Sequence, residues 1–348
     1  MPVRNVHERQ VPYRARWHRL SRNPAALVSA GVLFLLVVIA TATLPFSARW
    51  YNLQELTAAV RVPPSVTPVV AYSRYAGALE DPLRPGRGGT WSAVVRKLAP
   101  LAHMASSWLG HDELGRSLLY RLLPGFLITM SIGLVAAALA VVIGTGWGTV
   151  AALLGGRVDL VMMRVVDVLY GLPYILMVIL LKIGLRRPLT ALLGGNTKYS
   201  DVIILLVAIG AVSWLTMARV IRGQVLSLRE RPFVEAARAA GAGPWHILRR
   251  HLLPNLAGPI AVYATLVVPQ AILQAAFLSF LGIGVQQPVP SLGRLAADGV
   301  EAVNTFVAFW WLLVFPCGLL VITLLALNFL GDALRDAFDP KPSIAALT

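Results

Sequence analysis

The stretch Glu235–Asn255 reads EAARAAGAGPWHILRRHLLPN and lies between two long apolar runs. Pro232, just before it, suits the first position of a helix, and the residues that follow are good helix formers. Gly241 is placed to end that helix in the left-handed conformation. Pro244 then restarts a second helix, which runs to about Leu252. The pattern predicts two short helices at an angle, joined by a glycine hinge.

The rest of the chain is strongly apolar. Of its 348 residues, 57% are hydrophobic and 14% are charged, and the mean hydropathy is +0.69. Soluble domains carry about 25% charged residues, so this chain has too little polar surface to cover a globule in water. The net charge of +15 comes mostly from arginines at the ends of apolar runs, which is typical of membrane loops rather than of a nucleic-acid surface. We predict an all-α polytopic membrane protein that does not bind nucleic acid.

Apolar runs long enough to cross a bilayer, about 20 residues each, occur six times. The first follows Asn23, which suits a helix cap, and it is too long for the apolar part of a cleaved signal peptide. We predict spans over 24–44, 126–154, 166–185, 202–217, 256–283 and 306–329. The segment between the first two spans is rich in proline and glycine, so we expect loose structure there, with one helix near 91–108.

The arginines also predict the orientation. The N-terminal segment and the loop between spans four and five hold many of them, whereas the loop between spans five and six holds only Arg294. We therefore expect both termini to be cytoplasmic. The predicted organisation is a basic cytoplasmic segment (1–23), a first anchor (24–45), an extracytoplasmic segment (46–121), a core of five spans (122–330) with cytoplasmic helices over 232–253, and a cytoplasmic tail (331–348).

Three smaller features lie within the predicted spans. Gly144 and Gly148 lie one turn apart on one face of the second span, which permits close approach of another helix, although a kink is an equal alternative. Lys182, near the end of the third span, can extend its amine to the membrane interface. Arg164 and Asp167, near the start of that span, are expected to form a local ion pair.

The first short helix suits docking to another protein. Four alanines between positions 236 and 240 remove most side-chain bulk, which allows a helix to enter a narrow groove of a partner. Phe233, Val234, Trp245 and Leu248 are candidate anchors for the two helices. Composition alone leaves a second interpretation open, an amphipathic helix on lipid headgroups, which Trp245 and the arginines suit equally well.

The same stretch resembles the cytoplasmic coupling motif of ABC-transporter permeases. That motif is Glu-Ala-Ala, three residues, Gly, nine residues, an apolar residue, any residue and then Leu-Pro. His251 stands at the apolar position, but RHLLPN (250–255) is similar to the ending in the peptide and nickel importer subfamily. The resemblance implies that a separate ATPase contacts Glu235, Ala236, Ala237, Gly241, Trp245, Leu253 and Pro254.

Three further stretches resemble the second permease subunit of oligopeptide and dipeptide importers. They are LGHDELGR (109–116), LSFLGIGV (278–285) and LGDALRDAFDP (330–340). His111, Ser117 and Tyr120 replace the residues usual in and just after the first of them. The resemblance implies the ABC importer type I permease fold, with six transmembrane helices and cytoplasmic coupling helices. It also implies transport of di- or oligopeptides, with nickel or another small solute as the alternative.

The resemblance further implies the partners: a homologous second permease subunit, two ATP-binding subunits and an extracytoplasmic solute-binding protein, in the lipid of the cytoplasmic (inner) membrane. The chain has no Gly-x-x-x-x-Gly-Lys-Ser/Thr loop for phosphate, and no catalytic, cofactor or metal constellation stands out, so we expect a transport subunit rather than an enzyme. A secondary transporter driven by an ion gradient is the alternative from another class and would need acidic residues within the spans. A membrane-anchored interaction protein without transport is a third.

One face of the fifth predicted span carries polar residues. Counting from Tyr263, Gln270, Gln274 and Phe277 follow at offsets of 7, 11 and 14, which places all four on one side of a helix. Amide side chains at lipid depth need partners, either in a cavity or on a neighbouring helix. A role in lining the translocation path and hydrogen bonding between helices both remain open.

Overall fold

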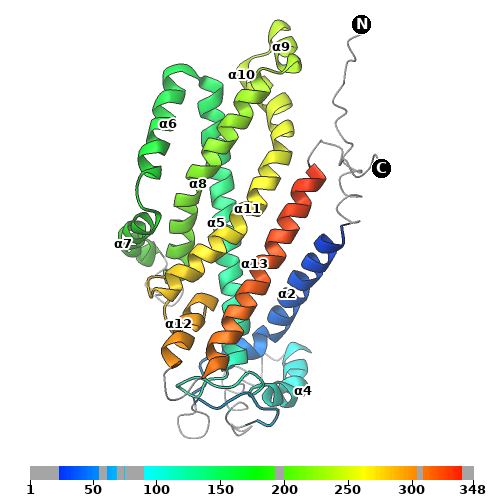
Figure 1. The fold of residues 1–348 in the computed structure, drawn as a ribbon, viewed down its shortest axis with the longest axis vertical. Coiled ribbons are helices and arrows are strands. Elements are labelled where there is room, and N and C mark those ends of the chain that lie inside the picture. The colour runs from blue at the N-terminus through cyan, green and yellow to red at the C-terminus, as the bar shows by residue number, and fades with distance from the viewer. Residues whose placement is uncertain are drawn as a thin grey trace.

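The computed structural model describes residues 23–54, 61–68, 74, 90–192, 200–303 and 309–338. They form a bundle of helices (Figure 1). The helices are α2 (Pro24–Trp50), α4 (Thr90–Ala105), α5 (Leu118–Leu154), α6 (Gly156–Tyr170), α7 (Tyr174–Leu192), α8 (Ser200–Arg229), α9 (Pro232–Ala239), α10 (Pro244–Ile247), the π-helix η1 (Leu248–Leu252), α11 (Leu253–Phe280), α12 (Leu292–Ala302) and α13 (Trp310–Phe338). Figure 1 shows α9 and α10 at one end of the bundle and α4 and α12 at the other.

Five of the described helices, α2, α5, α8, α11 and α13, are long and apolar enough to cross a membrane, and the bent pair α6–α7 makes up to six. The predicted spans are therefore recovered in order. Most of the helices are longer than the predicted spans, because an apolar run marks only the part of a helix within the hydrocarbon. α8 continues well past residue 217, and α13 continues past the predicted boundary at residue 330, so the described part of the predicted tail is helical.

The third predicted span is not a straight helix. α6 ends at Tyr170, α7 begins at Tyr174, and the two helices meet at an angle of 96°. The break contains Pro173, which has no N–H group to donate and disfavours the helical conformation of the residue before it. The prediction of one continuous span over 166–185 is wrong in shape, and Pro173 is the signal that predicts the break.

Close packing of α5 against α8 forms the centre of the bundle. A Cβ atom added at Gly148 would lie 2.3 Å from the carbonyl oxygen of Ala218, and one added at Gly144 would lie 2.5 Å from the Cβ of Met217. Only glycine leaves room for helices this close, so the predicted close approach is confirmed.

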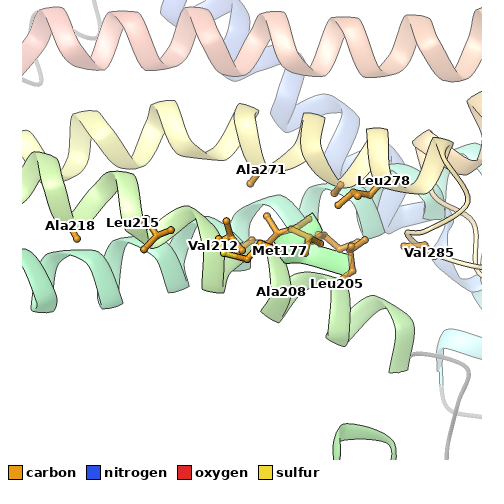
Figure 2. Close-up of a cluster of buried hydrophobic side chains, with 14 of the residues drawn as sticks. Met177, Leu205, Ala208, Val212, Leu215, Ala218, Ala271, Leu278 and Val285 are labelled. Atoms are coloured by element: carbon orange, nitrogen blue, oxygen red, sulfur yellow. The ribbon is translucent and has the colours of Figure 1, made fainter. Parts of the chain in front are cut away.

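A buried apolar cluster fills the space between α8, α11 and α7. In Figure 2, Met177 of α7 lies beside Val212 of α8, and Ala271 lies on α11, across from these two side chains. Its further labelled members are Leu205, Ala208, Leu215, Ala218, Leu278 and Val285. Burial of these side chains holds the bent pair against the bundle, since each large apolar side chain removed from water contributes about 1.5–3 kcal/mol.

The described parts of the segment between α2 and α5 are more regular than predicted. The amide of Ser65 donates to the carbonyl of Ser107 and that of His111 donates to the carbonyl of Val62, both at 2.9 Å. The indole Nε1 of Trp311 in α13 donates to the His111 carbonyl at 3.4 Å. Loose structure is therefore the wrong prediction for these residues, whereas the helix expected near 91–108 is confirmed as α4.

Asp112 joins this segment to α5, and Arg121 of α5 joins it in turn to α12. Its Oδ1 accepts from the backbone N–H groups of Leu114 and Arg116, both at 2.9 Å. Its Oδ2 accepts from Arg116 Nε at 2.7 Å and Arg121 Nη1 at 2.6 Å. Arg121, only 2% exposed, also lies 3.2 Å from Asp298 of α12. These contacts replace the hydrogen bonds to water that the carboxylate and the guanidinium lose on burial.

Candidate functional site

The first predicted short helix is present as α9. It begins at Pro232 and is followed by Gly241, whose φ of 82° lies in the left-handed region, as predicted. The Gly241 amide donates to the Arg238 carbonyl at 2.9 Å, and the Ala242 amide donates to the Ala237 carbonyl at 3.0 Å. These bonds satisfy carbonyls at the helix end that lack partners within the helix.

The second predicted short helix is an extension of the fifth span. α10 forms one turn from Pro244, η1 continues it as a π-helix, and α11 begins at Leu253 without a break, so that one helix of 37 residues runs from Pro244 to Phe280. At 1.5 Å per residue this helix is about 55 Å long, longer than the hydrocarbon core of a bilayer, which is about 30 Å thick. The helix is therefore long enough to cross the bilayer and to project beyond it at one end.

Two of the four candidate anchors are not available to a partner. Val234 is fully buried and Leu248 is 4% exposed, because both pack with Ile221 and Val225 of α8 in an apolar cluster. They fix α9 and η1 to the protein's own bundle, so the prediction that they contact a partner is wrong. Trp245, at 71% exposed, and Phe233, at 37%, remain accessible.

The residues of the coupling resemblance lie together on this projecting end, and most are accessible. Glu235, Ala236, Gly241, Trp245, Leu253 and Pro254 are exposed, and Ala237 is half-buried against the cluster that holds Val234. Ala236, Ala237 and Gly241 are small, and Trp245 is the one large aromatic residue among them. Such a surface suits insertion into a groove of another protein.

The polar face of α11 is divided between two cavities. Gln270 and Gln274 line a cavity of about 390 Å³ at the α6–α7 break, whose other described lining residues are Leu169, Tyr170, Leu172, Tyr174, Met177, Val212, Ser213, Leu215, Thr216 and Val267. Tyr263 lines a separate cavity of about 310 Å³ beside Gln224 and Arg335. Phe277 is 46% exposed and lines neither cavity. The structure therefore brings together only Gln270 and Gln274 of the four predicted residues.

Tyr174 is the residue at this cavity that sequence reasoning missed. Its hydroxyl donates to Gln274 Oε1 at 2.7 Å and joins the start of α7 to the second half of α11. The hydrogen bond depends on the bend after Tyr170, and a straight third span would not have placed Tyr174 there. Pro173 is again the only sequence signal for it.

Charged residues near the break have partners that differ from the predicted ones. Asp167 pairs with Arg219 of α8 at 3.0 Å instead of with Arg164, and the Arg219 guanidinium lies 4.4 Å from the centre of the Tyr170 ring. Lys182 donates to the carbonyls of Ile283 and Gly284, the latter at 3.0 Å, and lies 3.8 Å from Asp201. Lys182 therefore joins α7 to the turn that follows α11 and to the start of α8.

His111 occupies an unusual position in the segment between α2 and α5. Its side chain is fully buried, and neither ring nitrogen has a hydrogen-bond partner among the described residues. Burial lowers its pKa from 6.5 to about 4, against a smaller opposing effect of the Asp112 charge. The imidazole is therefore held in its neutral form at neutral pH.

α12 was also missed at the level of sequence. Its N-cap is Ser291, whose hydroxyl accepts a hydrogen bond from the Arg294 amide at 3.2 Å. A serine at the N-cap is a recognisable start signal, but the helix has only 11 residues and three of them are charged, so it has no span-like apolar run.

Comparison with known proteins identifies relatives of the chain. The family model described as "Binding-protein-dependent transport system inner membrane component" matches residues 140–344, and a model for the N-terminal TM domain of oligopeptide transport permease C matches residues 12–64. The dipeptide transport system permease protein DppC of Bacillus subtilis is 42% identical over 237 residues, which cover 68% of this chain and 69% of that protein. The oligopeptide transport system permease protein OppC of Escherichia coli K12 is 46% identical over 234 residues, which cover 67% and 72%.

A solved structure has the same fold. A chain of the MetNI methionine ABC transporter, in an inward-facing conformation, superposes with a TM-score of 0.50 at 22% sequence identity. The match covers 64% of this chain and 98% of that chain.

Proposed function

Because the chain belongs to the binding-protein-dependent transport system inner membrane components, we propose that it is a membrane-spanning subunit of an ATP-driven ABC importer for di- or oligopeptides. The relatives named for dipeptide and oligopeptide transport support this substrate class. The amides and hydroxyls that line the cavity at the α6–α7 break support it too, because they match the hydrogen-bonding groups of a peptide. Nickel or another small solute remains the alternative cargo.

The projecting segment α9–η1 is the observation that carries this proposal. It presents exposed Ala236 and Trp245 at the end of a 37-residue helix that includes a span, and buried Val234 and Leu248 fix it to α8. In the proposed mechanism a separate ATP-binding subunit receives this surface. Its ATP-driven closure moves the long helix as a lever and rocks the spans between inward-open and outward-open states.

The proposed orientation places α9 in the cytoplasm. The start of α2 and the end of α13 are directed toward the end of the bundle that holds α9 (Figure 1), which supports cytoplasmic positions for both termini. In this organisation residues 1–23 and 331–348 flank the span region on the inner side, and 46–121 lie outside. A second, homologous permease subunit, two ATP-binding subunits and an extracytoplasmic solute-binding protein would complete the transporter.

Reconstitution of these components in lipid vesicles tests the proposal. ATP should drive uptake of a radiolabelled oligopeptide only when the ATP-binding subunits are present. Ala236→Trp, which adds a large side chain to the exposed face of α9, should reduce uptake to background while membrane insertion persists. Thr67→Trp makes a comparable addition at an exposed site outside the projecting segment and should leave uptake unchanged.

Each alternative predicts another outcome. Normal uptake by Ala236→Trp would contradict the proposed coupling surface. Uptake of nickel but not of peptide would show that nickel is the cargo and would leave the proposed mechanism unchanged. Uptake driven by an ion gradient without ATP would favour a secondary transporter, and failure to recover any ATP-binding subunit with the purified chain would favour an interaction protein without transport.

A further inference from the structure

Three features coincide in the middle of the bundle. The first is the break between α6 and α7, where backbone between Tyr170 and Tyr174 leaves the helical hydrogen-bond pattern. The break faces residues 212–216, in the middle of α8, and residues 267–274, in the second half of α11. Non-helical backbone at that depth of a membrane is tolerated only where protein covers it or where it lines a cavity that holds water or solute. In this structure the break lines a cavity.

The second feature is the set of polar side chains in that cavity. Gln270 is exposed, Gln274 is half-buried, and Ser213, Thr216 and Tyr174 add hydroxyl groups. The Tyr174 hydroxyl uses the oxygen of the Gln274 amide, at 2.7 Å, and leaves the Gln274 N–H groups to donate elsewhere. The cavity therefore offers donors and acceptors that the protein's own bonds do not consume.

The third feature is that none of the described lining residues is charged. Just before the break, Asp167 in the last turn of α6 forms an ion pair with Arg219 of α8 at 3.0 Å, so the two charges are paired with each other. A neutral cavity selects little on the charge of a ligand's side chains or ends. It can instead recognise neutral groups that both donate and accept hydrogen bonds.

The main chain of a peptide is such a ligand. Every residue other than proline presents one N–H donor and one C=O acceptor, whatever its side chain. A glutamine amide presents the same pair of functions, so it can bond to a peptide group in two directions at once. The cavity volume of about 390 Å³ lies within the usual range for small-molecule sites, of about 300–1,000 Å³.

We propose that the cavity between the α6–α7 break, α8 and α11 binds the main chain of the peptide in transit, with Gln270 and Gln274 bonded to its peptide groups. Tyr174 is a positioning residue, because its hydroxyl holds the Gln274 amide in one orientation. Such a site would accept peptides of varied sequence and charge. The inference rests on the proposed function and adds to it where, and by which part, the cargo is recognised.

Depsipeptides test this directly. In a depsipeptide one internal N–H is replaced by an ester oxygen, so the ligand loses a single main-chain donor and keeps its side chains. Uptake of a peptide and of its ester analogue is measured in vesicles that contain the complete transporter, at concentrations well below saturation. Because the same solute-binding protein serves every variant, a change in the peptide-to-ester uptake ratio between variants belongs to the permease.

Gln274→Leu and Gln270→Leu remove the amides from the cavity. At least one of these variants should take up the peptide about five- to tenfold more slowly, as expected for one lost hydrogen bond. Gln270→Leu, which removes the amide oxygen that Tyr174 does not engage, should also lose much of the discrimination against the ester. The matched control is Gln224→Leu, the same change at a half-buried position of α8 that does not line this cavity. The peptide-to-ester uptake ratio of Gln224→Leu should equal that of the wild type.

Gln274→Glu tests the same site if the leucine variants fail to assemble. Glutamate has nearly the same shape as glutamine and adds one negative charge, so it should raise uptake of lysine-containing over glutamate-containing peptides by several-fold. Wild-type ratios in all the cavity variants, or an equal change in Gln224→Leu, would overturn the inference. If the wild-type transporter took up no peptide with ATP, the proposed function itself would fail, which is a different result.

Discussion

Replacement of Gly148 by alanine should separate the two central helices of the bundle. The added Cβ would lie 2.3 Å from the Ala218 carbonyl oxygen and 2.9 Å from the Arg222 amide nitrogen, whereas ordinary van der Waals contact begins at 3.4 Å. Both atoms belong to the backbone of α8, so no side-chain rotation relieves the overlap. α5 and α8 must move apart by about 1 Å, and overpacking of this kind costs about 1–3 kcal/mol.

Gly146→Ala is the matched control for that substitution. It makes the same chemical change two residues away on α5, where an added Cβ meets nothing within 4 Å. Alanine favours a helix over glycine by about 1 kcal/mol, so this variant should be as stable as the wild type or slightly more stable. Gly148→Ala gains the same helix propensity, so the difference between the two variants isolates the cost of the overlap.

Thermal unfolding of the purified chain in detergent measures this difference. At about 2–4 °C per kcal/mol, Gly148→Ala should unfold several degrees below Gly146→Ala. Both variants and the wild type need the same scan rate, because unfolding of membrane proteins is commonly irreversible and the apparent midpoint then depends on rate. Equal midpoints for the two variants would refute the close approach of α5 and α8.

Three further predictions concern the ends of the bundle. Gly241→Ala meets no steric overlap but must adopt a φ of 82°, at a cost of about 1–2 kcal/mol, so amide hydrogen exchange in α9 should accelerate by about tenfold while α11 is unaffected. The folded-state pKa of His111, about 4, lies below its unfolded value of 6.5. The contribution of this residue to stability is therefore fully present above pH 6.5. It falls by up to about 1.4 kcal/mol per pH unit between pH 6.5 and pH 4. His111→Gln should flatten this part of the profile of apparent melting temperature against pH, and an unchanged profile would show that another group is responsible. Arg121→Met leaves the buried Asp112 carboxylate short of a donor and should destabilise the fold by about 3–5 kcal/mol in thermal unfolding, whereas the double variant with Asp112→Asn should recover part of that loss.

Features that depend on local chemistry could be predicted from the sequence. Asn23 caps α2 with its side-chain oxygen at 3.0 Å from the Ala25 amide, because asparagine before an apolar run satisfies free helix donors. Gly241 takes the left-handed conformation because other residues adopt it only with strain. The spans follow from the length of apolar runs, and the coupling stretch from a motif with fixed spacing.

Features that depend on the partner of a side chain could not be predicted in the same way. Val234 and Phe233 are adjacent apolar residues, and only the position of α8 decides that the first is buried and the second is half-exposed. Asp167 could pair with Arg164 one turn away, but Arg219 of another helix is its partner. A helical period places Tyr263 and Gln270 on one face, yet the neighbouring helices divide that face between two cavities.

Crosslinking from position 236 tests the central claim most directly. In a Cys317→Ser background, Ala236→Cys is coupled to a maleimide with a photoreactive group, and the assembled transporter is irradiated in its native membrane. We expect covalent adducts between this chain and an ATP-binding subunit, and none from Thr67→Cys at the opposite end of the bundle. Adducts only with lipid, or with the extracytoplasmic solute-binding protein, would contradict it.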